Sequence, residues 1–340
     1  MRLMTMPLIA RRVSEVVEAR MLEVPVIALQ GPRSVGKSTV LADIARRHDA
    51  TIIDLDETRV RAAVAAEPGA FVEGSRPVFV DEYQKVPEIL DAIKAELTTD
   101  YRPGRFVLTG STRFDALPRA AQSLTGRIHF VSILPFSQGE MAGVHENFLE
   151  VALTDSDRFS TGMGTGLDRV GYAERICAGG MPVAVAAMPM ARTRWFDDYT
   201  NVSIRRDVTD LSRVRRGAVL PTLLARVAGQ TGQVLNVRAA GRAVDLDPST
   251  ASAYVTLLED LFLVRRLPAW GRTLRARATA LPKVHVVDSG LAARLLRLTP
   301  AKLARLDPAS LTEFGHLLET FVIGELLKQV SWSDHVSGVG

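Results

Sequence analysis

The stretch LQGPRSVGKSTVLADIARRH, residues 29–48, decides how the rest of the chain is interpreted. Its residues 31–38 match the pattern GxxxxGK followed by Ser or Thr in full. Glycines let the backbone turn tightly enough for its N–H groups to surround phosphate oxygens, and a helix that begins at Lys37 directs its positive end to the same place. The predicted phosphate-binding loop comprises Gly31, Pro32, Arg33, Ser34, Val35, Gly36, Lys37, Ser38 and Thr39. An incidental glycine turn is the alternative.

The context of the loop favours phosphate binding. Short apolar runs rich in Val, Ile and Phe alternate with longer helical patterns in the first half of the chain. The expected strands are 24–30, 50–56, 76–82, 105–111 and 127–133, and the expected helices include 37–48, 86–97 and 116–124. Continuous apolar runs are typical of strands buried on both faces, and alternating strands and helices favour a parallel sheet covered by helices on both sides. The sequence therefore predicts a three-layer α/β fold of the P-loop NTPase class.

Two adjacent acids, Asp81 and Glu82, end the expected strand 76–82. Because neighbouring carboxylates repel each other, such a pair after a buried strand favours a nearby cation. We expect Ser38 and Asp81 to hold Mg²⁺, Lys37 to reach the β- and γ-phosphates, and Glu82 to orient and polarise the attacking water. A helix cap followed by an exposed acid is the alternative for the two carboxylates.

Two further polar groups are candidates for the catalytic site. The run FVLTGS ends in hydroxyls, and we expect its strand to lie between the first strand and the acid-bearing one, with Ser111 sensing the γ-phosphate and Thr109 as the second choice. A plain turn is the alternative. Arg127, just before the fifth strand, is predicted to supply charge to the transition state within the chain or across a subunit boundary. A surface arginine that caps a helix end is the alternative.

Several neighbouring classes of protein are excluded by what the sequence lacks. It has no Asn/Thr-Lys-x-Asp element for guanine and no LSGGQ-type signature of transporter ATPases, and small-molecule kinases with a P-loop do not usually carry the acid pair. The motifs therefore predict binding and hydrolysis of ATP with Mg²⁺.

The bulk composition is that of an ordinary globular protein, with 47% hydrophobic and 24% charged residues among 340. Its one cysteine, Cys177, cannot form an internal disulfide, which favours a reducing compartment. The longest mainly apolar run, 176–191, is too short for a membrane span and is interrupted by Gly and Pro. We expect a cytoplasmic protein that does not contact the membrane.

The segment 205–277 is basic, with thirteen Arg, no Lys and six acidic residues, a local excess of +7 in a chain of net charge +4. Within it, helices capped by Asn236 and Asp247 and a following strand pair predict a helix-turn-helix with a wing. The second helix carries no Arg or Lys and ends in Glu259 and Asp260, which argues against base readout. Two interpretations stay open: a DNA-binding module, or a surface for self-association or a protein partner.

Four stretches, ALQGPRSVGKST, VFVDEYQKVPEIL, FVLTGSTRF and SLTGRIHFVSILPFSQGE, resemble bacterial and archaeal AAA+-like ATPases with an appended C-terminal domain. The resemblance continues in order through GGMPVAV, WFDDYTNVSIRRDV and GHLLETFVIGELLKQ, and so covers nearly the whole chain. It implies an AAA+-like core with an additional strand, a winged-helix middle and the beginning of a restriction-endonuclease-like region. Arg206 and Asp207, in its best-matched part, contact nucleotide or a neighbouring subunit in one interpretation and form a structural ion pair in the other.

We therefore expect an ATPase domain at 1–158, a linker and helical region at 159–215, a winged-helix-like domain at 216–280 and an incomplete nuclease-like segment at 281–340. Members of the family usually continue into an acid and a Glu-x-Lys that this sequence lacks, and Glu319 and Glu325 do not share a helix face, so nuclease activity is not expected. The expected function is ATP hydrolysis coupled to the winged-helix module. An ATP-regulated DNA-binding or protein-interaction regulator with little turnover is the alternative.

Overall fold

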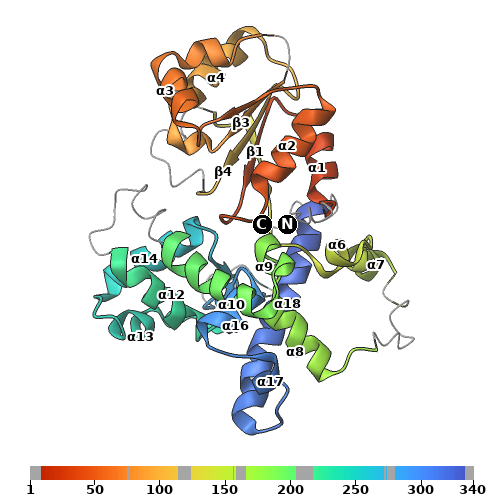
Figure 1. The fold of residues 1–340 in the computed structure, drawn as a ribbon, viewed down its shortest axis with the longest axis vertical. Coiled ribbons are helices and arrows are strands. Elements are labelled where there is room, and N and C mark those ends of the chain that lie inside the picture. The colour runs from red at the N-terminus through yellow and green to blue at the C-terminus, as the bar shows by residue number, and fades with distance from the viewer. Residues whose placement is uncertain are drawn as a thin grey trace, which may run out of the picture. The chain divides into compact units, whose positions relative to one another are not determined.

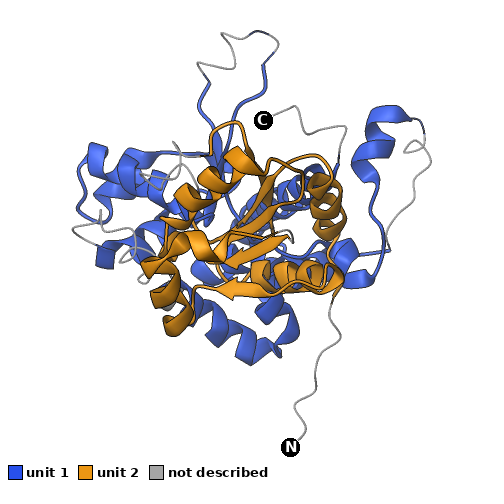
Figure 2. Ribbon diagram, turned by 90° about the horizontal axis from the view of Figure 1, so that it is seen from above, with its two compact units in different colours: residues 1–8, 135–340 blue, residues 9–134 orange. Residues whose placement is uncertain are grey.

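A computed structural model describes residues 9–74, 77–113, 124–155, 157, 166–203, 217–271, 273 and 280–333. The chain divides into two compact units, an N-terminal unit of residues 9–134 and a C-terminal unit that begins at Pro135 (Figures 1 and 2). The predicted helix at 116–124 lies outside the described residues except for its last residue, and the pair Arg206 and Asp207 lies wholly outside them. The division of the sequence into four segments stays a prediction.

The N-terminal unit is built on a five-stranded parallel sheet with the strand order β2-β3-β4-β1-β5. Figure 1 labels β1, β3 and β4 of this sheet. The strands are β1 (Val26–Gln30), β2 (Ile52–Asp54), β3 (Val78–Asp81), β4 (Phe106–Gly110) and β5 (Ile128–Ser132). Each coincides with one of the five predicted apolar runs. β4 lies between β1 and β3, as the sequence predicts for an additional-strand P-loop fold.

Helices cover both faces of this sheet, which confirms the predicted three-layer α/β class. They are α1 (Val13–Met21), α2 (Lys37–Arg47), α3 (Thr58–Ala66) and α4 (Ile89–Thr99), with short 3₁₀ turns at Pro68–Phe71 and Tyr83–Lys85. One core joins Ile27, Leu29 and Val107 to α1 and α2, and the other joins Val26 and Val80 to α4. Alternate residues of the central strands β1, β3 and β4 thus serve opposite layers, which explains why these strands are mainly apolar.

A buried arginine that the sequence analysis did not predict stabilises the amino edge of the sheet. Arg105, directly before β4, is 2% exposed and donates to Glu96 at 2.8 Å and to Asp100 at 3.1 Å. Its guanidinium also lies over the ring of Phe106, 5.0 Å from the ring centroid. A buried arginine needs such partners because an unpaired charge in the interior is costly. The network ties α4 to the beginning of β4.

The C-terminal unit is mainly helical. Its helices are α6 (Gln138–Ala142), α7 (Phe148–Thr154), α8 (Arg169–Ala178), α9 (Pro182–Ala186), α10 (Pro189–Asp198), α12 (Leu220–Ala228), α13 (Val237–Arg242), α14 (Pro248–Asp260), α16 (Ser289–Leu295), α17 (Pro300–Leu303) and α18 (Pro308–Trp332). Asn236 caps α13 and Asp247 caps α14, as predicted. No helix among the described residues is long and apolar enough to cross a membrane.

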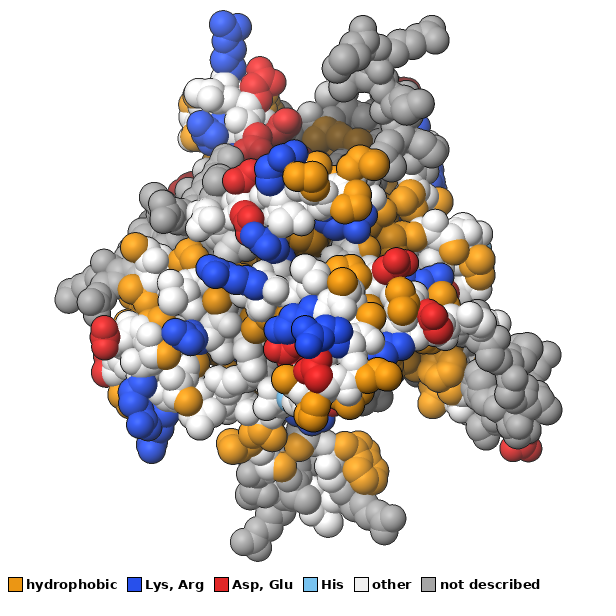
Figure 3. All heavy atoms as spheres, turned by 60° about the horizontal axis from the view of Figure 1, so that its bottom comes forward, with side chains coloured by type: hydrophobic (Ala, Val, Ile, Leu, Met, Phe, Trp, Pro, Cys, Tyr) orange, Lys and Arg blue, Asp and Glu red, His pale blue; other side chains and the backbone are white. Residues whose placement is uncertain are grey.

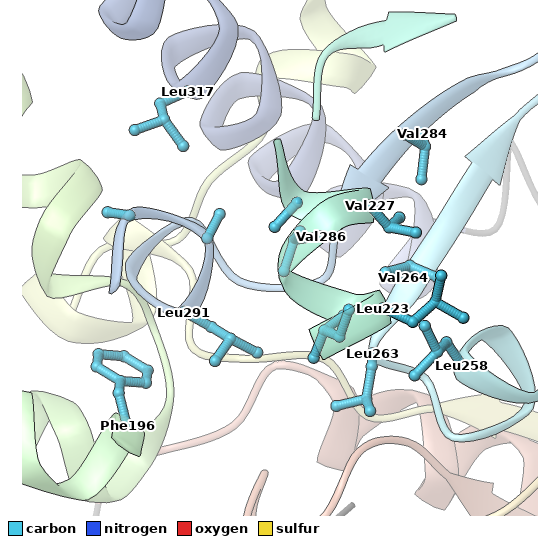
Figure 4. Close-up of a cluster of buried hydrophobic side chains, with 14 of the residues drawn as sticks. Phe196, Leu223, Val227, Leu258, Leu263, Val264, Val284, Val286, Leu291 and Leu317 are labelled. Carbon is cyan, nitrogen blue, oxygen red and sulfur yellow. The ribbon is translucent and has the colours of Figure 1, made fainter. Parts of the chain in front are cut away.

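A small antiparallel sheet and one hydrophobic core join these helices. The strands β6 (Gln233–Val234), β7 (Val264–Leu267) and β8 (Lys283–Val286) pair in the order β6-β8-β7. Figure 4 shows the core, in which Val227 and Leu258 from α12 and α14 gather with Val284 from β8 and with Leu291 and Leu317. The core therefore extends from α12 through the sheet to α16 and α18.

His285 on β8 is buried in this unit with an incomplete set of hydrogen bonds. It is 3% exposed, and its Nδ1 lies 3.1 Å from the Thr320 hydroxyl, while its Nε2 has no hydrogen-bond partner among the described residues. Burial lowers the pKa of His285. Glu319 and Lys283 act on that pKa in opposite directions, and they pair with each other at 2.6 Å.

We expect the stability of the C-terminal unit to fall in mild acid because of His285. Its pKa in the folded state lies below the usual value of about 6.5, so the unfolded chain takes up the proton first as the pH falls. Stability is then lost below about pH 6.5, by up to about 1.4 kcal/mol per pH unit. All three tryptophans lie in this unit, so denaturation followed by their fluorescence measures it.

His285→Asn should remove this part of the pH dependence, and His129→Asn, at an exposed position of β5, should leave it unchanged. An equal acid sensitivity in His285→Asn and the wild type would contradict the assignment.

Candidate nucleotide-binding site

The predicted phosphate loop follows β1 directly and has the backbone of an anion-binding turn. A Cβ at Gly31 would overlap the carbonyl oxygen of Ile133, so only glycine fits at the first position. Ser34 and Gly36 have φ of 59° and 99°, which are left-handed conformations. α2 begins at Lys37, and its first helical hydrogen bond runs from Val40 N to Gly36 O at 3.0 Å. α2 therefore directs its N-terminus, the end at which helices bind anions, toward this loop.

Lys37 is held inside the loop. It is 4% exposed, and its ammonium donates to the carbonyl oxygens of Gly31 and Pro32 at 3.0 and 2.9 Å. These bonds place the positive charge against the same backbone that would surround a phosphate. Ser38 and Thr39, in the first turn of α2, are exposed. The loop thus combines a buried cation with accessible hydroxyls.

An arginine that the sequence analysis missed fixes this loop from outside. Arg11, before α1, donates to Val35 O at 3.0 Å and to Leu134 O at 2.5 Å. One guanidinium therefore ties the phosphate loop to the chain that leaves β5. The two bonds join residues 24 and 123 positions apart in the sequence, so no local pattern indicates them.

The register of the parallel strands brings the acids to the same edge as the loop. Leu29 of β1 pairs with Thr109 of β4, and Val80 of β3 pairs with Leu108, so Asp81 lies beside Thr109. The buried Thr109 hydroxyl donates to Asp81 Oδ1 and accepts from the backbone N–H of Glu82 at 3.0 Å. Thr109 therefore orients both acids.

Glu82 is 8% exposed and has a left-handed backbone, with φ 55°. Its Oε2 accepts from the Ser111 hydroxyl at 3.3 Å and from the Gln84 amide. The Gln84 amide also donates to Ser111 at 3.1 Å. A left-handed non-glycine residue is strained, and such strain is concentrated at functional sites. Lys37, Asp81, Glu82 and Ser111 thus meet at one edge of the sheet, and Gln84 is a member that the sequence analysis missed.

Arg127 is the predicted catalytic residue that the structure does not bring to this site. β5 runs parallel to β1, with Ile128 beside Val26 and Ser132 beside Gln30. Arg127 is therefore at the amino edge, about four strand residues or roughly 13 Å from the edge that carries the loop. The fold does not support a role for Arg127 within its own site. A role across a subunit boundary stays a prediction.

Comparison with known proteins agrees with this geometry. Residues 23–142 match the AAA domain family, and residues 169–302 match a domain of unknown function, DUF8612. The Walker-type ATPase paby2304 of Pyrococcus abyssi has a similar fold, with a TM-score of 0.52 and 16% identity, over 85% of this chain and 96% of that chain. The family match supports an AAA-like domain in the N-terminal part of the chain, and the solved structure supports the fold alone.

Two uncharacterised proteins, one from Mycobacterium tuberculosis and one from Mycobacterium bovis, are each 26% identical to this chain over 304 residues. The aligned part is 89% of this chain and 62% of each relative. The chain thus spans less than two thirds of the length of the curated relatives it matches.

We expect Gly31→Ala to disorganise the phosphate loop without unfolding the N-terminal unit. The added methyl group overlaps the Ile133 carbonyl oxygen, which is backbone and cannot turn aside. Such overpacking costs about 1–3 kcal/mol. Hydrogen exchange of the amides of residues 33–38 should become faster. The matched control is Gly69→Ala, because nothing lies within 4 Å of a Cβ at Gly69. Unchanged exchange in Gly31→Ala would show that the close approach to Ile133 does not hold the loop.

Proposed function

We propose that the N-terminal unit binds ATP with Mg²⁺ and hydrolyses it. The observation that carries this proposal is the strand register, which brings a GKS loop, two carboxylates and a hydroxyl to one edge of a parallel sheet. The residues at this edge fit Mg-ATP. A buried ammonium and the N–H groups of a helix N-terminus suit the phosphates, and carboxylate and hydroxyl oxygens suit Mg²⁺. The match to the AAA domain family supports the same activity.

Each residue at this edge has a defined role in the proposed reaction. Lys37 and the backbone N–H groups of residues 33–38 hold the phosphates, and Ser38 and Asp81 hold the metal. Mg²⁺, when bound, neutralises the charge that develops on the transferred phosphate. Glu82 accepts the proton of the attacking water. Ser111 lies beside Glu82, so its response to the γ-phosphate would reach the base directly.

The bonds to Glu82 favour slow basal turnover. Gln84 and Ser111 both donate to its Oε2, and these two bonds occupy the lone pairs with which that oxygen would accept a proton from water. In the catalytic cycle, Glu82 then either releases its hydrogen bonds to Gln84 and Ser111 or accepts the proton of water on its other oxygen, Oε1. An enzyme controlled in this way hydrolyses ATP quickly only when the site is rearranged.

The chain offers a direct route from this site to the C-terminal unit. Ile133 packs against Gly31, Leu134 accepts from Arg11, and the next residues enter the other unit. There Phe136 N–H donates to Gly180 O at 2.8 Å, and Phe136 O accepts from the Lys328 ammonium at 2.9 Å. We infer that a change in the loop on ATP binding reaches α18 through this run of backbone.

Glu82→Gln should bind Mg-ATP as tightly as the wild type and lose at least about a hundredfold in turnover, because the amide cannot accept the proton. Lys37→Ala should lose binding. Glu88→Gln, the same change at an exposed position of the following turn, is the matched control and should leave both unchanged. The measurements are equilibrium nucleotide binding and phosphate release. Equal turnover in Glu82→Gln and the wild type would refute the assignment of the base.

A second function, ATP-regulated DNA binding, is favoured by the arrangement of the middle of the chain. α12, β6, α13, α14, β7 and β8 follow one another in the order of a winged helix, and the sheet order β6-β8-β7 suits that fold. Glu259 is buried and pairs with Arg266, so its charge does not lie on the exposed face of α14. Ser249, Ser252 and Thr256 are exposed on α14.

The surface charge gives this second function less support. Figure 3 shows one face of the molecule, on which described Lys and Arg side chains are interspersed with Asp and Glu and with hydrophobic side chains. Arg238 and Arg242 on α13 are exposed, whereas many arginines of the basic segment lie outside the described residues. The alternative binding partner that the sequence predicts for this module is another protein or a second copy of the chain.

If the module binds DNA, affinity for a short duplex should fall steeply with salt, because binding to phosphates releases counterions. The double change Arg238→Gln and Arg242→Gln should reduce both the affinity and the salt slope, by about one slope unit for each phosphate that an arginine no longer neutralises. Arg305→Gln, an exposed arginine outside this module, is the control. Fluorescence anisotropy measures both quantities. If no binding to the duplex is measurable at low salt, with or without ATP, the DNA-binding role is refuted and the protein-interaction role remains for the module.

A further inference from the structure

The C-terminal unit contains a cavity of about 540 Å³ between α8, α10, α16 and the beginning of α17. These helices contact one another, and Figure 1 shows them close together. Cavities of this size are typical of sites for small organic molecules. The cavity belongs to neither the nucleotide loop nor the winged-helix elements, and the function proposed above does not use it.

One part of the cavity wall is apolar and rigid. Phe196, Ala293 and Leu298 line it and are 2%, 1% and 6% exposed. They belong to the hydrophobic core of the unit, and Figure 4 shows Phe196 in that core near Leu291. Residues packed in a core keep their positions, so this wall is preformed.

Two guanidinium groups in the wall are fixed in position by the protein. Arg192 donates through Nε and Nη2 to the carbonyl oxygens of Ala184 and Ala187, at 2.8 and 3.2 Å. Arg294 donates through Nε and Nη2 to the two oxygens of Asp197, each at 2.7 Å. Neither Nη1 takes part in a hydrogen bond to the residues that the structure describes. Each group therefore presents oriented donors at low entropic cost.

The charges of the lining residues favour an anion. Three arginines, Arg175, Arg192 and Arg294, line the cavity together with one carboxylate, that of Glu174, and Asp197, which pairs with Arg294, brings the balance to three positive and two negative charges. Cys177, also in the lining, does not compete as an anion, because burial raises the pKa of its thiol to about 12, although Arg192 lowers it. Positive charge with fixed donors beside an apolar wall matches a molecule that has an acidic group and an apolar body.

We propose that this cavity binds a small organic anion, a carboxylate or phosphate with an apolar body, whose acidic group is held by Arg192 and Arg294 and whose body packs on Phe196, Ala293 and Leu298. The site is separate from the ATP site, and the proposal does not rest on ATP hydrolysis. Binding there would bridge α8, α10 and α16.

Cys177 makes the proposal testable in the intact protein, because it is the single thiol of the chain. The rate at which 4,4′-dithiodipyridine modifies it is measured with naphthalene-2-carboxylate, with 2-naphthyl phosphate, and with the neutral 2-naphthylmethanol. Titration calorimetry provides an independent affinity. We expect at least one anion to slow modification and to bind at least about tenfold more tightly than the alcohol, because charge-assisted hydrogen bonds are lost with the acidic group. The better anion identifies the acidic group.

Arg192→Gln should weaken anion binding about tenfold or more, and Arg194→Gln, an exposed neighbour on α10 that does not line the cavity, should not. Ala293→Leu keeps every charge and fills part of the cavity, so it should weaken binding of the anions and slow modification even without a ligand. Tryptophan fluorescence confirms that each variant is folded. Equal binding of anions and alcohol, no protection by either anion, or unchanged binding in folded Arg192→Gln and Ala293→Leu would overturn the proposal.

Discussion

The hydroxyl of Thr109 is the group on which the acidic edge of the sheet depends. It is fully buried, donates to Asp81 and accepts from the backbone N–H of Glu82, so one side chain holds the carboxylate of Asp81 and the backbone of Glu82. Since β4 lies between β1 and β3, the same residue connects the acids to the strand that leads into the phosphate loop. A residue without a hydroxyl here would leave a buried carboxylate and a buried N–H without their partner.

The fold of the N-terminal unit was predictable because its central strands β1, β3 and β4 are largely buried on both faces and therefore mainly apolar. Such runs stand out against the amphipathic helices between them, and each of the five lies where the sequence places it. The ends of the elements were less predictable. The run at 50–56 contains a strand of only Ile52–Asp54, because pairing with β3 decides its length. The burial of Arg105 could not be predicted from the sequence either, because it is a consequence of tertiary packing.

The candidate site also has parts that continuous sequence motifs predict and parts that depend on contacts formed only in the folded chain. The loop and the acid pair are continuous motifs, so their chemistry was readable from the residues and from the strands before them. Gln84 lies two positions after Glu82, yet its hydrogen bond forms only when the short turn after β3 brings it back to the acid. Arg127 lies just before β5, as the sequence indicates, but its motif gave no indication of which edge of the sheet it would occupy. The strand register, which no single segment contains, puts it at the other edge.

Arg11 has a practical consequence for dividing this chain into fragments. The match to the AAA domain family begins at residue 23, after both Arg11 and α1. A fragment cut at that boundary would keep every phosphate-loop residue and lose the guanidinium that joins Val35 to Leu134, together with Val13 and Val17 from the core under β1. The smallest piece that retains the loop in its described conformation therefore begins before Arg11 and extends through Leu134.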